Sequence, residues 1–390
     1  MDSVTYLTPE TGPLPEKVRR AMGRNVYGMS GPELQAACKR INAGLQLLLG
    51  TLENVRIMLC GLDDARQEVM RRLFDPGSVV LVVEAGLQGL KLSDAAQACG
   101  LEVVALPIPW ERAVKPGEVE NTLTRWPEIS GVIINRVEMS TGALHPVQEI
   151  SGLCRSFRKK LIVDATGSLA SHACRQEAWG ADCVLSASGA DSMTLPGAVF
   201  LAPGALFSHE TRGCSVPDVP PELLLDGGRL FTGSFFSREG LHILPGLDAA
   251  LGELTPELLN SRLKKANALC VMARAGIEAM GLEILVQRNF SAALTCVRLN
   301  PGIDAERLLQ TAGNDYKVVM SRGQKQLKER VLRMGHSGST CWKDILAGLA
   351  ALYQAYRKCY GVCGARDYLE KAWQAYCDHS RESERTDGSA

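Results

Sequence analysis

The chain has 390 residues, of which 46% are hydrophobic and 22% are charged, and its 43 Lys and Arg residues balance 43 Asp and Glu residues. This composition is typical of a globular protein with one large and one smaller domain, and a chain without a basic face is not expected to bind nucleic acid or a charged membrane surface. Because no apolar run approaches the roughly 20 residues of a membrane span and the N-terminus has no signal-peptide pattern, we expect a cytoplasmic protein.

Residues 1–15 are expected to form an irregular arm. Three prolines, Pro9, Pro13 and Pro15, interrupt any regular pattern before Glu16. The pattern alone leaves open whether this arm packs on the large or on the small domain.

Residues 16–250 are predicted to form a large α/β domain with a mostly parallel, seven-stranded sheet. Short β-branched runs recur at regular intervals, and amphipathic segments fill the intervals. This alternation is typical of β-α-β crossovers with helices on both faces of the sheet, and ligands bind beyond the carboxyl ends of such strands. The seven runs are 55–60, 79–83, 101–106, 131–135, 161–164, 183–186 and 198–202.

Residues 251–378 are predicted to form a smaller α+β domain with its own antiparallel sheet. A long helix pattern leads into a strand at "SAALTCVRLN", a helix at "DAERLLQTAG", strands at "YKVVM" and "RVLRMG", and a helix from Trp342 to Tyr356. A further helix, "ARDYLEKAWQAYCDH", is interpreted only as a packing or oligomer contact. Residues 379–390 are polar and are predicted to form a disordered tail.

No metal site is expected from the sequence. The 13 cysteines are scattered, and the closest pair, Cys359 and Cys363, has no second pair or histidine cluster beside it. We interpret the cysteines as reduced and mostly buried thiols rather than as zinc ligands or disulfides. The HExxH, P-loop and GxGxxG patterns do not occur in the sequence.

Several segments occur in an order that is shared with a known family. They are "YLTPETGPLPEKVRRAM", "VEMSTGALHPVQEI", "LIVDATGSL", "AWGADCVLSAS" with "LPGAVFLAP", and "RVLRMGHSG", and together they cover residues 5–355. With this order the chain resembles the class V aminotransferases of the fold-type-I pyridoxal-phosphate enzymes, of the alanine–glyoxylate or serine–glyoxylate type. The resemblance implies pyridoxal phosphate as cofactor, a small amino acid and a 2-oxo acid such as glyoxylate or pyruvate as substrates, and a homodimer whose site is closed by residues 229–242 of the neighbour.

The resemblance also implies roles for five residues. Asp164 ends the strand "LIVD" and corresponds to the aspartate that keeps the pyridine ring of the cofactor protonated, although from the residues alone it could cap the following turn. Ser140 and Thr141 correspond to residues beside the edge of the ring, or they form a plain polar turn. Ser188 corresponds to a hydroxyl on the phosphate side. Arg333 corresponds to the arginine that binds the substrate carboxylate, with a weak surface ion pair as the alternative.

Three departures from the family pattern fall on the same cofactor. Ala190 stands at the position of the Schiff-base lysine, and a methyl group can neither form an imine nor transfer a proton, which is typically worth about 10²- to 10⁴-fold in rate. The phosphate-binding turn reads Gly61-Leu62-Asp63-Asp64, where we expect an aspartate to cap the next helix and to repel a phosphate dianion. Gln88, after Leu87, stands where an aromatic residue stacks on the ring, and its stacking is weaker.

The sequence therefore predicts a class V aminotransferase-like protein in which ordinary transamination is impaired or absent. The alternative is a catalytically silent relative that keeps the fold, together with Arg333, to bind a carboxylate ligand or a partner protein. Lys91, Lys325 and Lys328 lie near the implied site, but no spacing recommends any of them for the role of the missing lysine. His336 is interpreted as a structural residue of the turn after Arg333.

Overall fold

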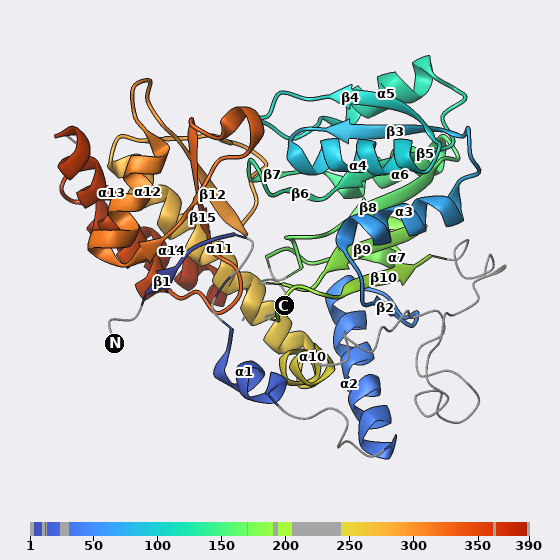
Figure 1. Cartoon of the computed structure of the whole chain (residues 1–390), viewed down its shortest axis with the longest axis horizontal. Helices are drawn as coiled ribbons and strands as arrows, with labels where there is room; N and C mark the ends of the chain where they lie inside the picture. Colours follow the sequence, from blue (N-terminus) through green and yellow to red (C-terminus); the bar gives the residue numbers. More distant parts are fainter. Residues whose placement is uncertain are drawn as a thin grey trace.

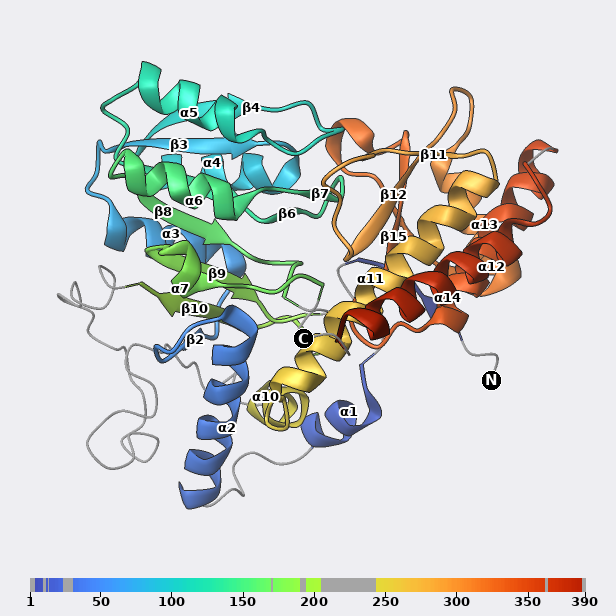
Figure 2. The same cartoon turned by 180° about the vertical axis from the view of Figure 1, so that it is seen from behind.

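The computed structural model describes residues 4–9, 12, 14–23, 31–169, 171–189, 194–204, 243–361 and 364–387. A large sheet covered by helices lies beside a smaller sheet with its own helices, and the long helix α11 (Pro256–Ala279) extends from one towards the other (Figure 1, Figure 2). This arrangement confirms the predicted fold class, an α/β fold with a second, smaller α+β part. Ala190 and residues 229–242 lie outside the described ranges.

Seven strands form the large sheet in the order β2-β10-β9-β8-β5-β3-β4, and they coincide with the seven predicted runs. Strand β10 is antiparallel to both of its neighbours, and the other pairings are parallel. The carboxyl ends of the other strands therefore meet at one edge of the sheet. The bounds are β2 (Arg56–Met58), β3 (Val79–Glu84), β4 (Glu102–Pro107), β5 (Gly131–Asn135), β8 (Lys160–Asp164), β9 (Cys183–Ala187) and β10 (Val199–Pro203).

Side chains alternate between the two faces of this sheet, as the period of two in a strand requires. On β3, Leu81 and Val83 pack in the core with α2, α5 and α6, whereas Val80 and Val82 pack in a separate core with α3 and α4. Because both faces are buried, the strands are nearly continuous apolar runs. These helices are α2 (Gly31–Leu49), α3 (Leu62–Leu73), α4 (Leu87–Ala98), α5 (Pro116–Arg125) and α6 (Val147–Ser156).

The smaller sheet has the order β11-β12-β15-β14 and is antiparallel throughout. The segment "YKVVM" differs from the prediction, because its strand β13 (Val318–Val319) pairs in parallel with β1 (Thr5–Tyr6) of the N-terminal arm and not with this sheet. The elements of this part are β11 (Glu283–Ile284), β12 (Leu294–Arg298), α12 (Ala305–Tyr316), β14 (Ser321–Arg322), η4 (Lys325–Leu327), β15 (Val331–Gly335) and α13 (Trp342–Tyr360). The remaining short elements are α1 (Glu16–Met22), β6 (Val137–Glu138), β7 (Ala143–Leu144), α7 (Gln176–Trp179) and α10 (Leu244–Leu251).

The N-terminal arm packs on the small domain. Leu7 is fully buried in the core that contains side chains of α11 and α13, and its carbonyl accepts the N–H of Gly335 at 2.7 Å. Glycine is needed at this point, because an added Cβ on Gly335 would lie 2.8 Å from the Cα of Pro9. The close approach holds Pro9 against β15 of the small sheet, and from there Pro9 contributes to the cavity described below.

Helix α14 (Tyr368–Asp387) packs along α11 and α13. Tyr368 stacks on Tyr353 with ring centroids 4.4 Å apart, and the ring of Trp373 lies 5.0 Å from that of Trp342. The helix continues to Asp387, into the segment for which the sequence predicts a disordered tail from residue 379. In the structure, α14 is held to the small domain by these aromatic contacts.

The cysteines that the structure describes are free thiols, and most of them are buried. Burial raises the pKa of Cys154 and Cys174 to about 12, which keeps these thiols protonated and unreactive. Among the described residues, no group of three or more His, Cys, Asp or Glu side chains could hold a metal ion. Within the same ranges, every helix is too short or too polar to cross a membrane.

Three histidines, of which two are fully and one is largely buried, are held in the neutral form. Burial lowers the pKa of His145 and His336 to about 4 and that of His172 to about 3. His145 Nδ1 accepts the backbone N–H of Val114 at 3.2 Å, and His172 Nε2 accepts that of Ala292 at 3.1 Å. Only a neutral ring has a nitrogen that can accept a hydrogen bond.

We therefore expect acid to destabilise the fold. In the unfolded chain these rings protonate at about pH 6.5, so the unfolded state binds more protons than the folded state between about pH 4 and 6.5. The free energy of unfolding should fall as the pH drops through this window, by up to about 1.4 kcal/mol per pH unit for each histidine. Denaturant unfolding at about pH 7, 6 and 5 measures the slope. His172→Gln should make it shallower, and an unchanged slope would contradict this account.

Candidate functional site

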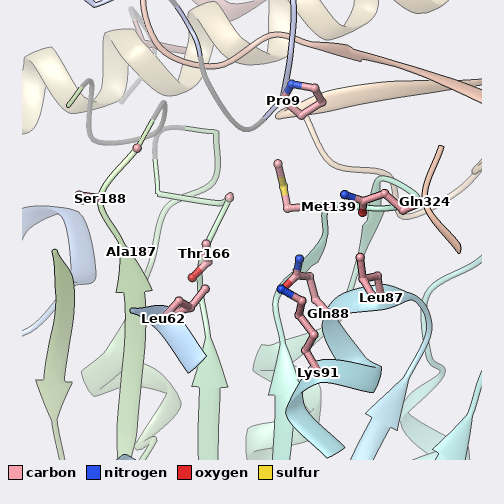
Figure 3. Close-up of a pocket in the computed structure, with 12 residues that line it drawn as sticks. Pro9, Leu62, Leu87, Gln88, Lys91, Met139, Thr166, Ala187, Ser188 and Gln324 are labelled. Atoms are coloured by element: carbon pink, nitrogen blue, oxygen red, sulfur yellow. The ribbon is translucent and has the colours of Figure 1, made fainter. Parts of the chain in front are cut away.

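A cavity of about 280 Å³ opens at the carboxyl edge of the large sheet (Figure 3). The N-terminal ends of α3 and α4 contribute Leu62, Gln88 and Lys91 to it, and Pro9 of the arm and Gln324 of the small domain face them across the opening. A doubly wound sheet binds its ligands at this edge. The other lining residues are Leu87, Met139, Thr166, Gly167, Ala187, Ser188 and Gly189.

A buried ion pair between Asp164 and Arg66 lies next to this cavity. Arg66 Nε and Nη2 both donate to Asp164 Oδ2, at 2.9 and 2.5 Å, and Asp164 Oδ1 accepts the N–H of Thr166 at 2.9 Å. The Asp164 side chain is 1% exposed and that of Arg66 is 0% exposed. One oxygen of Asp164 therefore binds the turn that follows its strand, which is the alternative role that the sequence left open for this residue. Arg66 occupies the other oxygen.

Two further acceptors surround the guanidinium group of Arg66. Its Nη1 donates to Asp63 Oδ1 and its Nη2 also donates to Gln88 Oε1, each at 2.8 Å. Burial by itself lowers the pKa of Arg66, but the attraction of Asp164 and Asp63 outweighs burial, and the net pKa is raised. The group is therefore a fixed, fully charged planar cation.

Helix geometry explains why Arg66 is buried. On α3, Val69, Met70 and Leu73 face the sheet and are buried, and residues three, four and seven positions apart share one face of a helix. Arg66 therefore lies in the apolar stripe of α3. A charge in that stripe is the signal by which the sequence could have revealed this residue, although its spacing from Asp63 is that of an ordinary surface pair.

The turn before α3 differs from the expected capping arrangement. Gly61 is the N-cap residue and makes no side-chain capping bond, while Asp63 and Asp64 lie inside the first turn of the helix. The prediction that an aspartate caps this helix is therefore wrong. Asp63 instead binds Arg66, and both carboxylates gain stabilisation from the helix dipole. They place negative charge where the resemblance implies a phosphate group.

A buried carboxylate, Glu138, fixes the start of α4. Its Oε2 accepts the N–H groups of Gln88 and Gly89 at 3.0 and 3.2 Å, and its Oε1 accepts the N–H and O–H groups of Ser140 at 3.0 and 2.6 Å. An added Cβ on Gly86 would lie 2.4 Å from the Glu138 side chain, so this position requires glycine. Gln88 thus extends towards the cavity from a rigid helix start.

The predicted hydroxyl residues bind a buried carboxylate or the backbone in this structure. Ser140 binds the buried carboxylate just described, and Thr141 Oγ1 accepts the N–H of Ala143 at 3.2 Å. Both are buried, and neither is among the described residues that line the cavity. Ser188 does line it, but its Oγ accepts the N–H of Ala198 at 2.9 Å. Their roles towards a cofactor stay predictions.

Arg333 lies on β15 and is 4% exposed. Its Nε donates to the carbonyl of Arg322 at 2.9 Å, and its Nη1 donates to the carbonyl of Met139 at 3.0 Å. The second bond ties the small sheet to the turn beside the cavity, of which Met139 is a lining residue. Arg333 itself is not among the described lining residues, and its binding of a carboxylate stays a prediction.

Of the three lysines near the implied site, Lys91 is the one that lines the cavity. Its Nζ lies 3.8 Å from Asp63 Oδ2, and its side chain is 43% exposed. Lys325 and Lys328 are exposed at the edge of the small domain. Thr166 lines the same cavity, and its buried hydroxyl has no hydrogen-bond partner among the residues that the structure describes.

Comparison with known proteins places the chain in a family. A sequence profile described as "Aminotransferase class-V" matches residues 61–194. The 2-aminoethylphosphonate–pyruvate transaminase 1 of Burkholderia lata is 32% identical over 285 residues, which cover 71% of this chain and 76% of that protein. The alanine–glyoxylate aminotransferase of Drosophila melanogaster is 24% identical over 86% of this chain and 88% of its own.

The fold agrees with these matches. The crystal structure of pyridoxamine–pyruvate aminotransferase from Mesorhizobium loti matches with a TM-score of 0.86 and 22% identity, covering 98% of each chain. The architecture is thus that of the fold-type-I transferases. Within that class, the chain belongs to the class V aminotransferase family, as its sequence motifs predict.

The residues beside the cavity do not fit the cofactor of this family, pyridoxal phosphate. The resemblance implies that a protonated pyridine nitrogen of the cofactor faces Asp164. In the structure, however, Oδ2 of that carboxylate accepts from Arg66 and Oδ1 accepts a backbone N–H. A second cation there would be repelled, since two unit charges about 4 Å apart repel by roughly 4 kcal/mol at an effective dielectric constant of about 20. Asp63 and Asp64 likewise oppose a phosphate, and Gln88 offers no aromatic face.

Proposed function

We propose that this member of the class V aminotransferase family does not carry out ordinary pyridoxal-phosphate-dependent transamination. The observation that supports the proposal best is the buried pair in which Arg66 occupies the carboxylate of Asp164. Ala190 adds to this support, because a methyl group at the position of the lysine cannot form an imine. The two changes are independent in the sequence and act against the same cofactor.

In this proposal the cavity is kept to bind a small carboxylate. The amine of Lys91 and the unpartnered hydroxyl of Thr166 are donors that suit such a ligand. The alternative is slow transamination between a small amino acid and a 2-oxo acid. The relatives favour this alternative by name, since their acceptors are pyruvate and glyoxylate.

Absorption spectra of the full-length protein with added pyridoxal phosphate test the proposal. We expect no imine band, because the chain lacks the lysine and the ring is excluded by Arg66. The Ala190→Lys variant is also expected to stay colourless. Colour in that variant would show that the missing lysine alone prevents imine formation. Borohydride reduction and peptide mapping locate any imine, with Lys91→Met as the control. A reducible imine on the unaltered chain, or alanine–glyoxylate turnover at rates typical of enzymes, would overturn the proposal.

A further inference from the structure

We propose that Arg66 is a built-in planar cation that replaces a protonated nitrogen ring against Asp164, and that removing its side chain opens a site for a free planar cation. The inference rests on the proposed function, because a chain that bound the cofactor ring would need the Oδ2 atom of Asp164 to be free. It goes further, because it assigns Arg66 as the residue that keeps free cations out of this site.

The hydrogen bonds of Arg66 require a flat cation beside Asp164. Two N–H groups of one flat side chain, Nε and Nη2, converge on a single carboxylate oxygen of Asp164. Both side chains are essentially inaccessible to solvent, so the pair is isolated from water and from competing ions. A planar group with several fixed donors can make this arrangement, whereas an ammonium group cannot reproduce it.

The guanidinium group of Arg66 is surrounded by acceptor oxygens. All of its hydrogen-bonding partners, Asp164 Oδ2, Gln88 Oε1 and Asp63 Oδ1, are acceptors. Without the guanidinium, these three oxygen atoms would form a niche with two negative charges and the amide of Gln88 as its neutral member. Such a niche selects a small flat cation with two or more N–H groups, such as a guanidinium, an amidinium or a 2-aminopyridinium ion.

The cavity supplies the route to this niche. Gln88 binds Arg66 and also lines the cavity. Leu62, on the same helix as Arg66, lines the cavity as well, and so does Thr166, in the turn that Asp164 binds (Figure 3). A ligand that enters the cavity therefore comes within one side chain of Asp164. In the native chain, the side chain of Arg66 blocks contact between such a ligand and Asp164.

Calorimetric titration and thermal unfolding with three probes test the inference. The probes are methylguanidinium chloride, 2-aminopyridine hydrochloride and methylammonium chloride, the last as a cation that is not planar. The variants are Arg66→Ala, the double variant Arg66→Ala/Asp164→Asn, and Arg72→Ala as a control on the same helix, where Arg72 pairs with Glu68. We expect Arg66→Ala to bind the two planar cations at least about tenfold more tightly than any other form of the protein does, and to melt at a higher temperature in their presence.

The outcomes separate this inference from the proposed function. Equal affinity of Arg66→Ala and the double variant for the planar cations, or equal affinity of Arg66→Ala for methylammonium, would overturn the inference and leave the proposed function standing. If Arg66→Ala does not fold alone, the probes are added during refolding. Recovery with the planar cations only supports the inference, and recovery with none of them overturns it. An imine on the unaltered chain would instead overturn the proposed function.

Discussion

Replacing Arg66 with leucine is expected to lower the free energy of unfolding by about 3–5 kcal/mol, because the buried carboxylate of Asp164 loses its counter-ion. Asp164 is 1% exposed in the native chain, and a leucine in place of Arg66 offers its carboxylate no hydrogen-bond donor. The N–H of Thr166 would remain as a donor to the other carboxylate oxygen, which is too little for an isolated charge. Denaturant unfolding followed by tryptophan fluorescence measures the loss at neutral pH.

A double-mutant cycle shows whether the loss belongs to the pair. Arg66→Leu/Asp164→Asn removes both charges and is expected to cost clearly less than the sum of the single variants, since no unpaired carboxylate remains. Arg72→Leu is the matched control, because Arg72 lies on the same helix but its bond to Glu68 is partly exposed. Additive losses in the cycle, or an equal loss in the control, would show that Arg66 acts through helix α3 and not through Asp164.

Replacing Glu138 with alanine is expected to cost about 3 kcal/mol or more, because it leaves several buried donors without an acceptor, at about 1–3 kcal/mol each. These donors are the backbone N–H groups of Gln88, Gly89 and Ser140. The variant also leaves a hole under the start of α4, which adds to the loss. Since Gln88 binds Arg66, the disturbance should reach the ion pair beside the cavity.

Two variants control this experiment. Glu138→Gln keeps the shape and one acceptor oxygen, and it should cost less than alanine. Glu128→Ala removes an exposed carboxylate ahead of β5 and should change stability little. Denaturant unfolding measures all three variants. If Glu138→Ala were as stable as Glu128→Ala, the carboxylate would not be the residue that fixes α4.

The sequence predicted the location of the site better than the hydrogen bonds that its residues make. Asp164, Gln88 and Ser188 were expected near one edge of the sheet, and the structure brings them to the same cavity or to its border. Ser140, Thr141 and Arg333 lie close by, with their polar groups on backbone or buried partners. A motif shared with a family carries the position of a residue along the chain, but it does not carry the hydrogen bonds that the side chain makes.

Arg66 shows why the rest could not be predicted. In the sequence it stands three residues after Asp63 in a helix rich in charge, which is typical of a solvent-exposed pair. In the structure it is the partner of a carboxylate 98 residues away. The aspartates before it were expected to cap the helix, but the helix begins at Leu62, so both lie inside its first turn, where Asp63 binds Arg66.

The sequence by itself determined the strands, most of the helices and the family, because apolar periodicity and the order of motifs are read along the chain and do not depend on how it packs. It also determined that position 190 carries no amine, since the side chain of Ala190 is a methyl group whatever its surroundings. Only the tertiary structure decided that Arg66 and Asp164 form a buried pair, and that β1 joins β13 and brings Pro9 to the cavity. Such contacts depend on how distant segments pack, and the free energy of a buried charge depends on the partner that packing provides.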